Sequence, residues 1–213
     1  MENNIIETGN TSEKRIYAGF FIRILSGLID WIINILFISI NFFIMLIIKK
    51  NQNLMSYFII LEIITILFQY IYYILIPQKF GGTFGKLILG IKIIKLNNQN
   101  IGFKESFLRY SINILWYIYD AIIKIYIIAN SSNELFNSFG SYTEWSNYLE
   151  NSKPKISIIA LIFINLWIFS EYIVLLFNKK RRGLNDYIAG TVIINKKYLH
   201  KIKEQAQTAY NKQ

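Results

Sequence analysis

Two ionisable residues interrupt a long apolar stretch near the start of the 213-residue chain. Arg23 and Asp30 are the only charged residues between positions 16 and 48. About 20 apolar residues suffice to cross a bilayer, and ionised groups inside one are costly and usually serve a role. Their spacing of seven residues places both on one helical face, which Asn34 and Asn41 continue. The sequence therefore predicts a membrane-spanning helix with one polar face turned away from lipid.

Four segments are long and apolar enough to cross a membrane, namely residues 20–48, 54–76, 107–129 and 156–177. They predict an all-α membrane protein, a bundle of four transmembrane helices. We assign residues 1–17 to a polar N-terminal tail, 18–195 to the transmembrane domain and 196–213 to a basic C-terminal tail. The polar start of the chain has no pattern of a cleavable signal peptide, so the first span is expected to direct insertion.

The positions of the basic residues predict the orientation. Sixteen Lys and Arg residues lie before the first span, between the second and third, or after the fourth, and four lie in the other two connections. This bias predicts both termini in the cytoplasm. The abundance of Ile, Lys and Asn indicates an AT-rich genome, so we expect a bacterial inner membrane. The bias explains most of the net charge of +10, and we expect attraction to anionic lipid rather than binding of nucleic acid.

Two shorter segments are expected to meet at the cytoplasmic face. Residues 81–96 predict a short interfacial amphipathic helix followed by a β-like segment. Residues 191–194 have strand propensity, and we expect them to pair with residues 91–94. The glycine-rich start of the first segment is not a nucleotide-binding loop, because a Ser or Thr must follow its lysine whereas Leu87 follows Lys86.

Three motifs in this order resemble those of the RDD family of membrane proteins. They comprise residues 18–23 with Asp30, residues 82–93 with Phe103 and Arg109 downstream, and residues 182–192. The resemblance covers about residues 16–195. It implies that Arg23, Asp30 and Asp186 are the arginine and two aspartates for which the family is named. The chain departs from the family pattern at Leu87, where a basic residue is often found, and at Asn185, where His is common.

The rise of a helix, 1.5 Å per residue, sorts the charged residues into two layers, which we call the polar spine. The inner layer contains Arg23, Asp30, Arg109, Glu171 and Asp186, and the outer layer contains Glu62, Asp120 and Lys124. We expect Arg23 to meet Asp186, with Glu171 as a competing partner. Asp120 and Lys124 are four residues apart, which favours an ion pair on one helix.

Two functions remain open. The spans contain four acidic residues but only three basic ones, Arg23, Arg109 and Lys124. One carboxyl group is therefore left over, and we choose Asp30 for it. This group is predicted to bind a proton and a cation alternately. The resemblance has the same implication, since ion–proton antiport has been proposed for some family members. The first function is therefore transport of small cations or protons, by a homo-oligomer because four spans form a thin bundle. The alternative is an accessory or assembly subunit that binds a membrane protein partner through residues 130–155 and the basic C-terminal tail. In a purely structural reading, the same charges only clamp the helices together.

Enzymatic activity is not expected. The chain has no cysteine, which excludes disulfides, thiolate metal sites and cysteine nucleophiles. It also lacks a Ser/His pair or a zinc-protease motif of catalytic type. We therefore expect no catalytic residues, no cofactor and no metal site.

Overall fold

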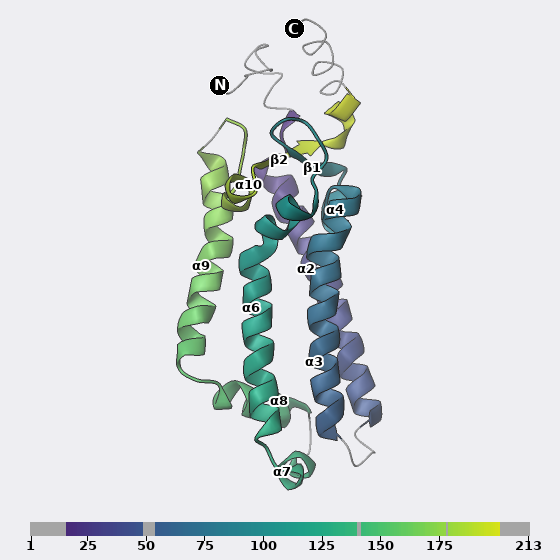
Figure 1. The fold of residues 1–213 in the computed structure, drawn as a ribbon, viewed down its shortest axis with the longest axis vertical. Coiled ribbons are helices and arrows are strands. Elements are labelled where there is room, and N and C mark those ends of the chain that lie inside the picture. Colours follow the sequence, from purple (N-terminus) through teal and green to yellow (C-terminus); the bar gives the residue numbers. More distant parts are fainter. Residues whose placement is uncertain (1–15, 49–53, 140–141, 178, 201–213) are drawn as a thin grey trace, which may run out of the picture. The chain divides into compact units, whose positions relative to one another are not determined.

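A computed structural model describes residues 16–48, 54–139, 142–177 and 179–200. These residues are mostly helical, and four helical stretches among them are long and apolar enough to cross a membrane. The long helices are α2 (Phe20–Ile48), α3 (Leu54–Tyr70) continued by η1 (Ile71–Leu75) and α4 (Ile76–Phe80), α6 (Phe103–Ala129), and α9 (Ile156–Leu176) (Figure 1). The predicted fold class is therefore confirmed. Most of the N-terminal tail and of the C-terminal tail lies outside the described residues.

Two helices are longer than the approximate spans predicted from the sequence. The helix of the second span continues past residue 76 through Pro77 to Phe80, and Gly81 ends it in the left-handed conformation (φ 85°). Proline is tolerated here because it stands in the first turn of α4, where no hydrogen bond from its nitrogen is needed. The third span begins at Phe103 rather than 107, because the Glu105 side chain accepts a hydrogen bond from Gly102 N (2.7 Å) and so stabilises an earlier start.

The chain divides into two compact units. Unit 1 is formed by Met1–Trp31, Tyr72–Ser111 and Trp167–Gln213, and unit 2 by Ile32–Ile71 and Ile112–Leu166. Each long helix contributes residues to both units.

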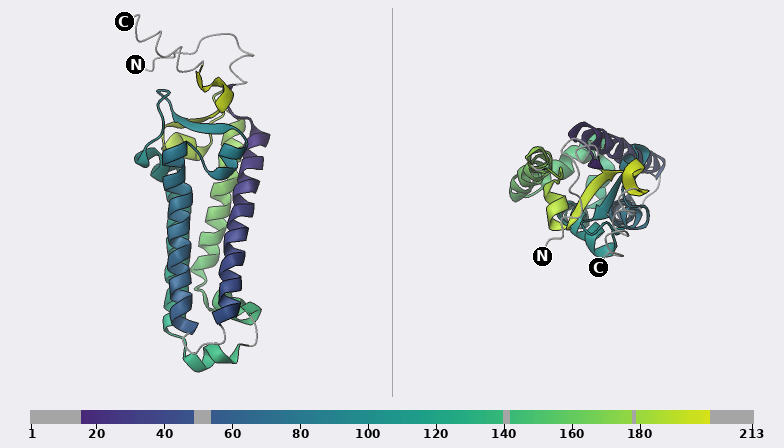
Figure 2. Two further views of the ribbon diagram at one scale, coloured as in Figure 1. Left: turned by 90° about the vertical axis from the view of Figure 1, so that its right-hand side faces the viewer. Right: turned by 90° about the horizontal axis from the view of Figure 1, so that it is seen from above.

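Unit 1 contains a two-stranded antiparallel sheet of β1 (Ile91–Lys95) and β2 (Thr191–Asn195), with Ile93 opposite Ile193. The predicted pairing of these segments is therefore confirmed, and both views of Figure 2 show the strands side by side. The N-terminal segment extends the sheet beyond β2, because Ala18 N donates to the Ile193 carbonyl (2.9 Å). The two ends of the described chain thus belong to one sheet.

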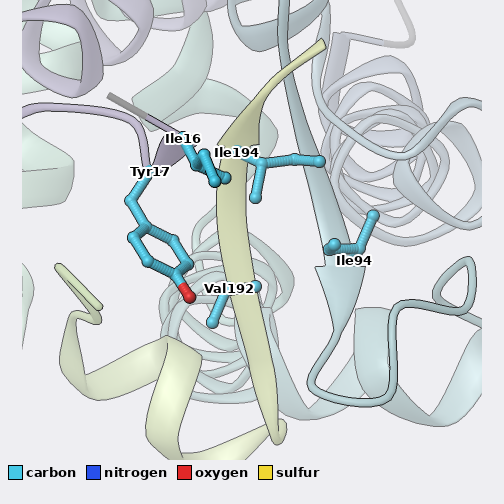
Figure 3. Packing of buried hydrophobic residues seen from close by; sticks show 5 residues of the cluster. All are labelled: Ile16, Tyr17, Ile94, Val192 and Ile194. Carbon is cyan, nitrogen blue, oxygen red and sulfur yellow. The ribbon is translucent and has the colours of Figure 1, made fainter. Parts of the chain in front are cut away.

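Apolar side chains cover both faces of this sheet. On one face Ile93 and Ile193 pack with Ala18 and Ile101. On the other face Ile16, Tyr17, Ile94, Val192 and Ile194 form a cluster. Figure 3 shows the Tyr17 ring extended toward Val192, and Ile194 close to Ile16. Burial on both faces explains why β2 has three consecutive apolar residues, whereas β1 includes Lys92 and Lys95, which are only partly buried.

Each strand follows a short helix in the same way. Helix α5 (Phe84–Ile88) leads through Gly90 to β1, and helix α10 (Leu184–Ile188) leads through Gly190 to β2. Both glycines have positive φ, 66° and 63° respectively, which only glycine adopts at low cost. The hydrogen bonds between the copies are reciprocal, since Leu96 N donates to Gly190 O and Lys196 N donates to Gly90 O. The sequence alone indicated no such repeat.

Unit 2 has its own apolar core. Ile127 and Ile128 of α6 pack with Trp145 and Leu149 of α8 (Tyr142–Ser152). A further short helix, α7 (Asn133–Ser138), precedes α8 in the connection to α9. The connection at residues 130–155 is therefore largely helical in its described part.

Candidate functional site

Asp186 lies at the centre of a buried charge cluster in unit 1. Its carboxylate accepts a hydrogen bond from Arg23 (2.6 Å) and a second one from Arg109. The side chain of Asp186 is 0% exposed, and those of Arg23 and Arg109 are 5% and 2% exposed. The predicted contact between Arg23 and Asp186 is present, and Arg109 reaches the same carboxylate.

The local fold holds Asp186 in place. Asp186 is the third residue of α10, where its side chain accepts a hydrogen bond from Gly183 N (3.0 Å) and caps the helix start. The Thr191 hydroxyl at the start of β2 contributes a further contact to the carboxylate (3.3 Å). The guanidinium of Arg182 donates to the carbonyls of Asp186 and Thr191 and lies over the Tyr187 ring, 4.0 Å from its centroid. The segment between α9 and β2 is thus tied around Asp186.

The charge of Asp186 follows from these contacts. Burial by itself raises the pKa of a carboxyl group, but the guanidinium groups of Arg109 and Arg23 outweigh it and hold the Asp186 pKa well below its usual range. Asp186 is therefore an ionised, fully paired group near neutral pH. It clamps α2, α6 and α10 together within unit 1.

Asp30 forms a second cluster in unit 1. One carboxylate oxygen, Oδ1, accepts hydrogen bonds from the Tyr72 hydroxyl (2.5 Å) and from Gly85 N (2.8 Å). The other oxygen, Oδ2, accepts one from the Thr83 hydroxyl (2.6 Å) and lies 3.6 Å from the Lys86 ammonium. Lys86 is a cation that the sequence prediction had counted outside the spans. The predicted surplus of one unpaired carboxylate was therefore wrong, because Lys86 in α5 supplies the missing positive charge.

The two clusters occupy corresponding positions of the repeat. Lys86 is the third residue of α5, as Asp186 is of α10. Helix α2 carries the partner of each, Asp30 for Lys86 and Arg23 for Asp186. The two pairs therefore have opposite polarity, with the cation on α5 in one and on α2 in the other.

Glu171 does not compete for Arg23. Its carboxylate accepts a hydrogen bond from the Asn185 side chain (2.6 Å), so the alternative pairing of Arg23 with Glu171 is not seen. A Cβ atom at Gly183 would lie 2.6 Å from Cγ of Glu171. The close approach of Glu171 thus requires a glycine at this position.

The other predicted residues meet in unit 2. The Lys124 ammonium pairs with Asp120 (2.8 Å) and Glu62 (3.4 Å). Lys153, which the sequence prediction did not include, also reaches Asp120 (2.7 Å). The inner and outer layers of the prediction thus correspond to separate clusters, one set in unit 1 and the other in unit 2.

Sequence reasoning missed three partners of Asp30. Thr83 and Lys86 lie in the glycine-rich motif, whose polar side chains carried a signal, but this segment was assigned to the membrane interface and not to the surroundings of Asp30. Tyr72 had no such signal, because it lies in the π-helical turn η1 inside an otherwise regular apolar helix. Turns of this kind occur frequently at functional sites.

Comparison with known proteins identifies relatives of the chain. A sequence model described as RDD family matches residues 17–190. The uncharacterized membrane protein YteJ of Bacillus subtilis (strain 168) is 23% identical over 207 residues, which cover 94% of this chain and 96% of the relative. No solved structure matches.

Proposed function

The chain belongs to the RDD family of membrane proteins, and on this premise we propose that it moves small monovalent cations across the membrane in exchange for protons. One observation carries the proposal: the carboxylate of Asp30 is buried in α2 and already has a cationic group, the Lys86 ammonium, at 3.6 Å. An ionisable group within a membrane-spanning helix is costly and usually belongs to a transport path or a relay.

The surroundings of Asp30 support a monovalent substrate. Its carboxylate is joined by the hydroxyl oxygens of Tyr72 and Thr83, and hard cations prefer oxygen ligands of this kind. Among the described residues, no three His, Cys, Asp or Glu side chains are placed to hold a metal ion together. A single carboxylate with neutral oxygens suits a singly charged ion that must also be released.

The repeat of short helix, glycine and strand also supports transport. Many secondary transporters consist of internal repeats, and their sites are formed where helices are interrupted and short helix N-termini point at charged groups. Here Gly81 ends α4 before α5 begins, and Gly85 N at the start of α5 donates to Asp30. The interrupted segment and the buried carboxylate therefore coincide.

We further propose that the protein lies in a bacterial cytoplasmic membrane with both termini in the cytoplasm. The distribution of basic residues supports this orientation. We propose a homo-oligomer as the transporting form and anionic lipid as the partner of the basic segments, with no role for nucleic acid and no enzymatic activity.

Purified protein in sealed liposomes tests the function. We expect an imposed pH gradient to drive sodium uptake by wild type, and Asp30→Asn to reduce this uptake to the level of empty liposomes. Glu150→Gln is the matched control, because Glu150 is an exposed carboxylate that pairs with Lys153 in unit 2. It removes the same charge and should leave uptake unchanged.

Sodium uptake that persists in well-inserted Asp30→Asn protein would rule out this proposal. The accessory-subunit alternative would then be favoured if a membrane protein co-purifies in fixed stoichiometry and is lost when residues 130–155 are deleted.

A further inference from the structure

We infer that the Lys86 ammonium occupies the position that the transported cation takes at Asp30, so that Lys86 sets the affinity of the site for its substrate. This inference rests on the proposed function and assigns a regulating residue to the same site. Lys86 would act as a tethered competitor, which the incoming ion displaces.

The contacts of the two carboxylate oxygens distinguish their roles. Oδ1 of Asp30 is held by Tyr72 and Gly85 N, both within 2.8 Å. Oδ2 receives the Thr83 hydroxyl, and the Lys86 ammonium lies 3.6 Å from Oδ2 and 3.3 Å from the Thr83 oxygen. The ammonium thus lies beside two oxygen atoms that are also suitable ligands for a monovalent metal ion. One positive charge at this place excludes a second.

The Lys86 contact is loose in comparison with the Asp186 clamp. Arg23 lies 2.6 Å from the Asp186 carboxylate, 1 Å closer than Lys86 lies to Asp30. The side chains of Arg23 and Asp186 are 5% and 0% exposed, whereas that of Lys86 is 13% exposed. A lysine is a point charge on a flexible stem, whereas an arginine is held by its planar group. Of these two side chains, Lys86 is therefore the one suited to leave its carboxylate and return to it.

The backbone closes one side of the Asp30 carboxylate. A Cβ atom at Gly85 would lie 2.7 Å from Oδ1 of Asp30 and would collide with the Ser26 carbonyl oxygen. The carboxylate is thus enclosed by backbone atoms of α2 and α5 on this side. The ion is therefore expected to reach the carboxylate from the Oδ2 side, where the Lys86 ammonium lies.

Other charged and titratable groups surround Lys86 and Asp30. Those in electrostatic reach of one or the other are Tyr72, Arg109, Tyr110, Glu171 and Tyr172. Wild type and variants are therefore compared at one pH, so that only the residue at position 86 differs between them.

The test compares Lys86→Gln, which removes the competing charge, with Lys86→Arg, which retains it. If Lys86 occupies the site about nine-tenths of the time, its removal should lower the apparent KM for sodium about tenfold. We expect turnover to fall in the same variant, because a tightly held ion leaves slowly. Lys86→Arg should keep the weak sodium affinity of wild type. A merely structural role for Lys86 would lower turnover without improving KM.

Binding is measured in parallel as the sodium- or lithium-dependent rise of the melting temperature of purified protein in detergent. The rise should begin at lower ion concentration in Lys86→Gln and should be absent in Asp30→Asn. An unchanged KM in Lys86→Gln, while Asp30→Asn abolishes uptake, would overturn the inference and leave the proposed function intact. Uptake that survives in Asp30→Asn would instead overturn the proposed function. If Lys86→Gln does not fold, Lys86→Met serves as the neutral variant, and an unchanged binding midpoint in it also overturns the inference.

Discussion

The two buried aspartates of unit 1 differ in the cations that neutralise them. Asp186 is paired with two guanidinium groups, from Arg23 and Arg109. Asp30 accepts hydrogen bonds from the neutral Tyr72 and Thr83 hydroxyls and lies beside the Lys86 ammonium group. Removing one partner of a buried ion pair is far more costly than the pair is worth, because an uncompensated charge is left behind. A locked cluster therefore suits a structural clamp, and a loosely paired carboxylate suits an exchanging site.

Asp186→Asn tests the clamp. The substitution leaves Arg23 and Arg109 buried without a counter-charge, so we expect the free energy of unfolding to fall by about 3–5 kcal/mol. Glu105→Gln is the control, because Glu105, at the start of α6, pairs with the more exposed Lys95 of β1. The unfolding free energy of this variant should stay within about 1 kcal/mol of that of wild type. Unfolding of the detergent-solubilised proteins by denaturant measures both. Equal effects of the two substitutions would argue against a clamp at Asp186.

We also expect the difference in stability between wild type and Asp186→Asn to depend on pH. The folded-state pKa of Asp186 is lowered, so its contribution to stability is complete above the unfolded pKa of about 3.9 and is lost as the pH falls through the folded value. The stability difference between wild type and Asp186→Asn should thus be constant between about pH 5 and 8 and shrink only in stronger acid. A difference that shrinks between pH 8 and 5 would mean that Asp186 is not held ionised by its arginines.

At the scale of elements, α5 and α10 depend on tertiary contacts. Each has five residues, and helices this short are not stable alone. Helix α5 is tied to α2 by the hydrogen bond from Gly85 N to Asp30. Helix α10 is tied to α2 by the ion pair of Asp186 with Arg23. The charged residues of α2 therefore position the two short helices, and each of these helices is followed by a strand.

Gly85→Ala tests this close approach. The added methyl group would collide with the Ser26 carbonyl and approach Asp30 Oδ1 to 2.7 Å, so α5 must move away from α2. We expect a loss of about 1–3 kcal/mol in unfolding free energy, together with loss of sodium uptake. Gly102→Ala is the matched control, because its methyl group would meet only the flexible end of Glu105 at 3.2 Å. Wild-type stability and uptake in Gly85→Ala would show that α5 need not pack against Asp30.

Periodicity and propensity predicted the elements, but not the partners of Asp30. Apolar runs predicted the four long helices, alternation of Ile with Lys predicted β1, and strand propensity predicted β2. The contact between Arg23 and Asp186 followed from helical rise and charge. By contrast, the π turn that directs Tyr72 toward Asp30 leaves no trace in an apolar pattern. Lys86 and Lys153 lay in segments counted as connections, whose folded course sequence spacing does not determine.

At the scale of the whole chain, the elements follow one order twice. Two long helices, a five-residue helix and a strand succeed one another in residues 20–95, and again, with α7 and α8 inserted between the long helices, in residues 103–195. All four long helices carry strongly exposed apolar side chains, among them Phe21, Leu67, Ile122 and Phe163. Such side chains suit contact with lipid, whereas the charged side chains of the clusters are largely buried. The membrane thus accounts for the exposed apolar surface, and the clusters account for the buried charge.

The orientation in the membrane is open to a direct test, because the natural chain has no cysteine. Single cysteines can therefore be introduced without a background of native thiols. We choose Gln99→Cys in the turn after β1 and Asn147→Cys in α8, both at exposed positions. Lys and Arg are in excess in the two terminal segments and in the connection between the second and third spans. This bias predicts that these three segments lie in the cytoplasm.

A membrane-impermeant maleimide added to intact cells should therefore label Asn147→Cys and leave Gln99→Cys unlabelled. Labelling of both after the membrane is opened is the control for reactivity. The reverse pattern in intact cells would place the termini outside. It would also put the Asp30 cluster near the opposite face of the membrane.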